Sequence, residues 1–115
     1  LRHLAEDVVI EFYGPPSIPY AGRYIGQAAA RGFFSTVLSS VVINRFEPEE
    51  MLAVADKVFV TGHLNLSPKT TTGTIDSAFA HVITLRDGQW VRFRDFMDTA
   101  VAMEAFRAPP RMATA

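Results

Sequence analysis

The sequence predicts an α+β domain in which one helix lies on a strongly curved, mostly antiparallel sheet. A single apolar stripe with helical spacing and a run of three or four strands after it favour this class. The 115 residues, 49% hydrophobic and 20% charged, suit one compact core. We expect a single domain over residues 1–115, with its core at about 5–106 and a tail at 107–115. One helix cannot fill such a concave face, so we also expect a cavity.

The first elements are a strand, a loop and a helix. Asp7–Tyr13 is rich in β-branched and aromatic residues, which is typical of a strand. Residues 14–26 mix prolines and glycines with aromatic residues and indicate a loop. In the helix that follows, the apolar positions form one stripe that must face a sheet: Ala30, Phe33, Phe34, Val37, Leu38 and Val41.

Four strand segments and a short helix complete the chain. We expect a strand at 41–46, an interruption at Glu47-Pro48-Glu49 and a resumption at 51–54, because proline cannot donate to a ladder and favours an edge or a bulge. Further strands are expected at 57–66 and 74–85. An Asp87-Gly88 turn leads into the last strand, and Asp98 or Thr99 caps a final helix through Phe106.

The last strand carries one carboxylate, that of Asp95, where an apolar residue belongs. Alternation gives it two faces, one with Val91, Phe93, Asp95 and Met97 and the other with Trp90, Arg92, Arg94, Phe96 and Asp98. Arg92 and Arg94 therefore cannot neutralise Asp95 from within their own strand. Because an unpaired buried charge is costly, Asp95 must find a partner, be protonated or line a cavity.

His81 is the expected partner of Asp95. The odd positions of 74–85 form the more apolar face of that strand, and His81 interrupts it. A three-residue loop with glycine in the left-handed region pairs odd with odd residues and joins the two apolar faces, so we adopt it over a two-residue loop. Asp95 would then orient the imidazole, whose other nitrogen meets a substrate proton. The alternative is a structural polar pair in a core without a ligand.

The segment PYAGRYIG at 19–26, the long strands, and HVITLRDGQWVRFRDFMDT at 81–99 resemble the SnoaL-like branch of the ketosteroid-isomerase and nuclear-transport-factor superfamily. The resemblance extends from about Ala5 to Phe106. It implies a cone-shaped α+β barrel, a curved sheet wrapped around helices, that dimerises through the outer sheet face. In that family one or two helices precede the first strand, and this sequence does not show them.

The resemblance also suggests positions for catalytic groups. The position of the catalytic base in ketosteroid isomerases corresponds to Phe12 here, so the usual base is missing. The position of the protonated aspartate in their oxyanion hole corresponds to His81. The Arg, Asp, Asp set of limonene-epoxide hydrolases falls at His63, Asn65 and Asp95, so that only the last is kept. Alternation alone would send His63 outward. The resemblance implies the reverse, and we follow it, with His63 or Asn65 positioning a carbonyl, enol or water.

An apolar small molecule is the expected ligand. The residues expected to contact it are Phe12, Tyr20, Phe34, Phe59, Phe79, Phe93 and Met97. We expect an isomerase, cyclase or hydrolase that needs no cofactor and acts on a carbonyl- or epoxide-containing compound. A noncatalytic ligand-binding or dimerisation module of the same fold stays open, as does a subunit whose cone is completed by another chain.

Composition and motifs argue against several other classes of function. A net charge of −1 gives no electrostatic footprint for nucleic acid or an anionic membrane. The absence of cysteine removes disulfides and thiolate metal sites and is compatible with the cytoplasm, where we expect the protein. His63, His81 and Asp95 come from dispersed strands, so we expect no metal. No glycine-rich phosphate loop or GxSxG pattern occurs.

Overall fold

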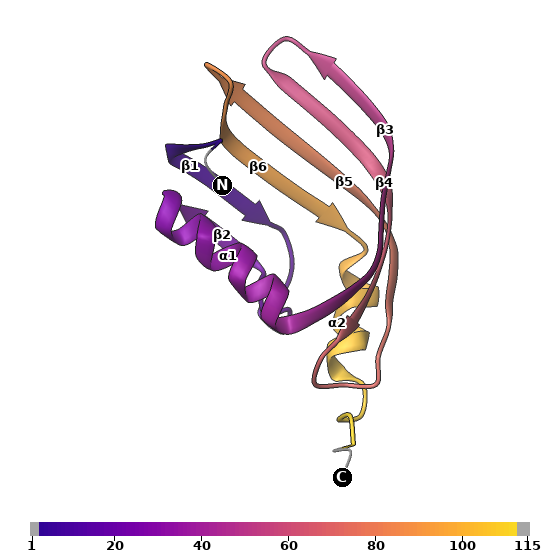
Figure 1. Ribbon diagram of the computed structural model, residues 1–115. Coiled ribbons are helices and arrows are strands. Elements are labelled where there is room, and N and C mark those ends of the chain that lie inside the picture. The colour runs from indigo at the N-terminus through magenta and orange to yellow at the C-terminus, as the bar shows by residue number, and fades with distance from the viewer. Residues whose placement is uncertain (1–2, 113–115) are drawn as a thin grey trace.

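The computed structural model describes residues 3–112, which form one six-stranded sheet and two helices (Figure 1). The elements follow in the order β1 (Leu4–Phe12), β2 (Gly22–Ile25), α1 (Gln27–Ser40), β3 (Val41–Val54), β4 (Lys57–Pro68), β5 (Ile75–Arg86), β6 (Gln89–Met97) and α2 (Thr99–Arg107). The fold class is therefore α+β, as the sequence predicts. Residues 113–115 of the expected tail lie outside the described residues.

The sheet has the strand order β2-β1-β6-β5-β4-β3. Every neighbouring pair is antiparallel except β1 and β6, which run parallel. The sheet curls without closing, so it makes a cone that is open at one side. Helix α1 lies across the concave face, and α2 packs at the end where β4 and β5 meet the C-terminal segment (Figure 1).

Helix α1 forms as its apolar stripe predicts, with one change at its end. Ala30 and Phe33 are buried against the sheet, and the helix begins after Gly26, whose φ of 90° suits glycine. Val41, expected as the last member of the stripe, has an extended backbone and begins β3. The helix and the following edge strand are thus joined without a loop.

Strand β3 is continuous where the sequence indicated an interruption. Its pairing with β4 shifts between Ile43 and Arg45 and again between Pro48 and Glu50, which marks two β-bulges. Pro48 lies on the edge strand and beside one of these bulges, settings in which sheets tolerate proline. The expected interruption is therefore a β-bulge within a continuous edge strand.

The β5–β6 hairpin has a different loop from the one expected. Asp87 (φ 53°) and Gly88 (φ 76°) form a two-residue turn with both residues in the left-handed region, and Arg86 pairs with Gln89. The prediction of a three-residue loop is wrong. A bulge at Val91 then shifts the register, so that Thr84 pairs with Arg92 and odd residues face odd ones from there on.

Two further segments differ from expectation. Residues 22–25, expected within a loop, form the short edge strand β2 beside β1. After α2, which Asp98 caps by accepting hydrogen bonds from the backbone N–H groups of Ala100 and Val101, the chain stays attached to the body of the protein. The N–H of Arg111 donates to the carbonyl of Thr70 at 2.9 Å, so the expected tail is fixed at least to that residue.

Candidate functional site

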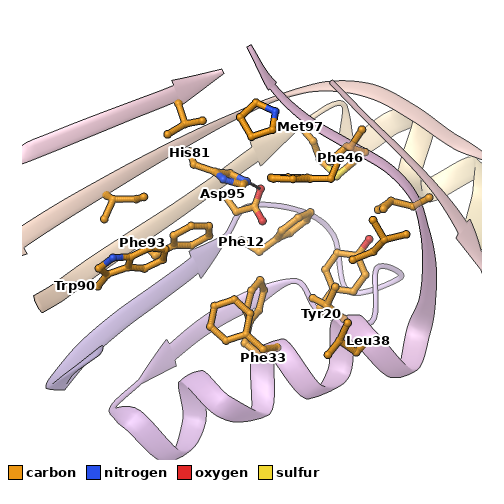
Figure 2. Close-up of a pocket in the computed structure, with 18 of the residues that line it drawn as sticks. Phe12, Tyr20, Phe33, Leu38, Phe46, His81, Trp90, Phe93, Asp95 and Met97 are labelled. Atoms are coloured by element: carbon orange, nitrogen blue, oxygen red, sulfur yellow. Dashed lines mark ion pairs between the residues drawn. The ribbon is translucent and has the colours of Figure 1, made fainter. Parts of the chain in front are cut away.

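Helix α1 and the concave face of the sheet line a cavity of about 510 Å³ that is open on one side (Figure 2). Its walls are almost wholly apolar. The helix contributes Phe33, Phe34, Val37 and Leu38; β3 contributes Ile43, Phe46, Pro48 and Met51; the other strands and the loop before β2 contribute Phe12, Tyr20, Val60, Leu64, Leu66, His81, Ile83, Trp90, Phe93, Asp95 and Met97. Few polar groups reach this cavity.

His81 and Asp95 stand side by side on the sheet wall of this cavity. They are direct cross-strand partners on β5 and β6, and Nε2 of His81 lies 3.3 Å from Oδ1 of Asp95. Their side chains are 14% and 17% exposed. Figure 2 shows the carboxylate directed into the cavity with the imidazole beside it. The facing that the sequence predicts for this pair is therefore found.

The imidazole of His81 is held by aromatic rings. Its centroid lies 4.6 Å from that of Phe79 and 4.8 Å from that of Phe93. Phe46 from β3 stacks on Phe79 at 4.7 Å and closes the same side. Packed rings leave the imidazole few alternative orientations, so its edge stays toward Asp95.

The nearby arginines are engaged on the opposite face, as alternation predicts. Arg92 donates to Glu11 at 2.6 Å, and Arg94 lies over the rings of Tyr13 and Phe96. The guanidinium of Arg92 holds the pKa of Glu11 below its usual value, since it donates a charged hydrogen bond to that carboxylate. Among residues 3–112, His81 is thus the basic side chain within ion-pair distance of Asp95.

His63 and Asn65 do not reach the cavity, so their expected inward facing is wrong. Their neighbours Leu64 and Leu66 line it, and strand alternation sends the odd residues of β4 to the outer face. There, Nε2 of His63 lies 2.7 Å from Asp76. Asn65 accepts a hydrogen bond from Asn44 at 2.9 Å. Alternation alone gave the right answer at these two positions.

Five of the seven residues expected to contact a ligand line the cavity. They are Phe12, Tyr20, Phe34, Phe93 and Met97. Phe59 does not, because it lies on the outer face of β4 with 38% of its surface exposed. Phe79 is buried behind the wall, where it supports Phe46 and His81 and does not line the cavity itself.

Strand bulges explain three of the lining residues that the sequence analysis missed. Trp90 was expected on the face opposite Phe93, yet the bulge at Val91 turns both inward, with their rings parallel and 5.3 Å apart. Phe46 and Met51 also reach the cavity after a bulge. Pro48 was the one sequence signal for a bulge in β3. It does not indicate to which face of the sheet the residues after the bulge point.

Tyr20 differs from the other aromatic residues of the wall. It is 2% exposed, and its ring makes edge contacts with Phe12 and Phe106. Burial raises the pKa of the phenol, and the negative charge of Asp95 raises it further. Tyr20 therefore stays protonated at neutral pH.

Among residues 3–112, no group of three or more His, Cys, Asp or Glu side chains is arranged to hold a metal ion. Neither helix described there has the length and apolar character needed to cross a membrane.

Comparisons with known proteins agree on the fold. The family model described as the SnoaL-like domain matches residues 1–93. An NTF2-like protein from Burkholderia xenovorans LB400 is 28% identical, with a TM-score of 0.84 over 91% of this chain and 79% of that one. A candidate isomerase from Bacillus subtilis is 27% identical, with a TM-score of 0.79 over 92% and 77%.

A third solved structure shares the fold at lower identity. It is a candidate SnoaL-like polyketide cyclase from Jannaschia sp. CCS1, 21% identical, with a TM-score of 0.74 over 95% of this chain and 76% of that one. No curated protein matches the chain.

Proposed function

The chain belongs to the SnoaL-like domain family, and from that premise we propose that it binds an apolar carbonyl compound and moves a proton on it. The observation that carries this proposal is the His81–Asp95 pair in an otherwise apolar cavity. Similar solved structures named as a candidate isomerase and a candidate polyketide cyclase support the same class of chemistry. The reaction proposed is an isomerisation or a ring closure that uses no cofactor.

The pair supplies the base. A C–H bond next to a carbonyl breaks readily because the electron pair left behind spreads onto the carbonyl oxygen. The pair accepts that proton, and an enolate forms. Return of the proton to another carbon completes an isomerisation. Attack of the enolate carbon on a second carbonyl instead closes a ring, and the alkoxide that forms takes the proton back from the pair. Positioned acid–base groups of this kind contribute roughly 10²–10⁴-fold to a rate.

The cavity walls select the substrate. A volume of about 510 Å³ falls in the range of ordinary small-molecule sites. Trp90 and Phe93 offer a flat aromatic wall, and Phe33 and Phe34 face it from α1. Such walls favour apolar rings, and the apolar surroundings of His81 and Asp95 strengthen their electrostatic interaction with charge that develops on the substrate.

Exchange of the protons next to a ketone tests the proposal. In heavy water, NMR would follow deuterium uptake by a panel of cyclic ketones that includes α-tetralone. We expect the protein to accelerate uptake, and Asp95→Asn to reduce the acceleration about 100-fold or more. Asp76→Asn, the same change in the outer histidine–aspartate pair, serves as the matched control and should leave the rate unchanged.

Two results would contradict the proposal. One is unchanged exchange by folded Asp95→Asn, as judged by circular dichroism. The other is the lack of acceleration by the wild-type protein for every ketone of the panel. The first result makes His81 and Asp95 a structural pair, and the second makes the protein a noncatalytic binding module.

A further inference from the structure

The hydroxyl of Tyr20 is a buried polar group without a protein partner. Within residues 3–112, its Oη is the one buried side-chain nitrogen or oxygen atom that makes no hydrogen bond. The ring is fixed by edge contacts with Phe12 at 5.0 Å, Phe106 at 6.0 Å and Phe33 at 6.5 Å. These contacts need only the ring, so phenylalanine would pack equally well.

A neighbouring tyrosine shows the contrast. Tyr24 donates from its hydroxyl to the backbone carbonyl of Tyr20 at 3.0 Å, and it does not line the cavity. The hydroxyl of Tyr24 is thus explained by the fold. The hydroxyl of Tyr20 is not, although leaving a buried donor unpaired destabilises a protein.

We propose that Tyr20 is a ligand-positioning residue whose Oη donates a hydrogen bond to a carbonyl oxygen of the bound molecule. The proposal rests on the proposed function, which supplies the carbonyl compound, and deepens it by fixing how that compound is oriented. Figure 2 shows Tyr20 on the helix side of the cavity and Asp95 on the sheet side. The carbonyl oxygen then points toward Tyr20, and the acidic C–H toward the His81–Asp95 pair.

The protonation state of Tyr20 fixes the chemistry of the ligand atom. Since burial and the charge of Asp95 both raise the pKa of its phenol, the group is a neutral donor at neutral pH. The matching ligand atom is therefore a hydrogen-bond acceptor. A hydrocarbon of the same shape fills the apolar walls but leaves the hydroxyl unpaired, so the site discriminates against it.

Tyr20→Phe tests this assignment with two readouts, in the full chain. Isothermal calorimetry would measure the affinities of α-tetralone and of tetralin, the hydrocarbon that lacks its oxygen. We expect the preference for the ketone to fall about tenfold in the variant. We also expect its thermal midpoint without ligand to rise by about 4 °C, because an unpaired buried group is removed.

Tyr24→Phe is the matched control. It should lower the thermal midpoint, because a satisfied hydrogen bond is lost, and it should keep the ketone preference. The proposal is overturned if Tyr20→Phe keeps that preference, if it lowers the thermal midpoint, or if wild-type protein does not prefer α-tetralone over tetralin. Failure of the proposed function shows separately, as exchange that does not depend on Asp95.

Discussion

Two histidine–aspartate pairs lie on opposite faces of the same sheet. The inner pair, His81 and Asp95, has side chains that are 14% and 17% exposed and faces an apolar cavity. The outer pair, His63 and Asp76, is closer at 2.7 Å but 33% and 61% exposed. Solvent screens the outer charges, whereas the inner pair acts in a poorly polarisable environment. The burial of the inner pair, more than its distance, therefore makes it the better candidate for acid–base chemistry.

A third carboxylate, that of Glu11, gives a pH-dependent prediction. The hydrogen bond from Arg92 holds the pKa of Glu11 below its usual value of 4.5 in the folded protein. A lowered folded-state pKa stabilises the protein above the usual value, and the benefit is lost as the pH falls through the lowered one. We expect Glu11→Gln to reduce the free energy of unfolding by up to about 1 kcal/mol near neutral pH.

Urea unfolding at a series of pH values checks this prediction. The difference between wild type and Glu11→Gln should shrink below the usual pKa of a glutamate and vanish in stronger acid. Glu6→Gln, at an exposed position of the same strand, is the control and should show no such difference. A difference for Glu11→Gln that stays constant with pH would contradict the assigned ion pair.

At the scale of the elements, bulges decide which side chains line the cavity. Each of the three register shifts in the β3–β4 and β5–β6 pairings brings residues three apart onto the inner face: Ile43 with Phe46, Pro48 with Met51, and Trp90 with Phe93. A regular strand would alternate and send the second member of each pair outward. The bulges therefore make the wall denser in large apolar groups than simple alternation allows.

The β-bulges also limit what the sequence can predict. The helical stripe of α1, the long strands and the facing of His81 and Asp95 follow from periodicity, which the backbone obeys wherever the ladder is regular. The loop of the β5–β6 hairpin was predicted wrongly, yet the bulge at Val91 restored the expected parity. Trp90 and Phe46 were missed because alternation carries no signal for an extra residue.

The second bulge of β3 gives a prediction for Gly62, which pairs with Pro48. A Cβ atom at Gly62 would collide with the carbonyl group of Glu47, and neither backbone can move without loss of pairing. We expect Gly62→Ala to reduce the free energy of unfolding by about 3 kcal/mol. Chemical denaturation measures the change.

The matched control makes the same substitution in α1. A Cβ at Gly32 meets nothing within 4 Å, and alanine is the better helix former by about 1 kcal/mol. Gly32→Ala should therefore stabilise the protein, with a change opposite in sign to that of Gly62→Ala. Equal stability of Gly62→Ala and wild type would show that the two strands do not approach so closely.

At the scale of the whole molecule, the outer sheet face carries apolar surface. Leu52 and Phe59 are cross-strand partners there, 61% and 38% exposed, and Val54 lies nearby at 54%. Exposed apolar side chains clustered on one face are typical of protein interfaces. We propose that two copies of the chain associate through this face, as the sequence analysis expects.

Sedimentation velocity tests the association. Wild-type protein should sediment as a dimer, and Leu52→Glu should weaken the dimer at least about tenfold, because a buried unpaired charge is costly. Met112→Glu places the same charge on a residue that is 86% exposed, away from this face, and should have no effect. A monomeric wild-type protein at micromolar concentration would refute the interface.

The placement of Trp90 has a practical consequence. It is the single tryptophan of the chain, and its indole forms part of the cavity wall beside Phe93. The intrinsic fluorescence of the protein therefore originates at the site itself. A molecule that enters will displace solvent from the indole and change its emission, so unlabelled protein can report occupancy and serve directly in a search for its natural ligand.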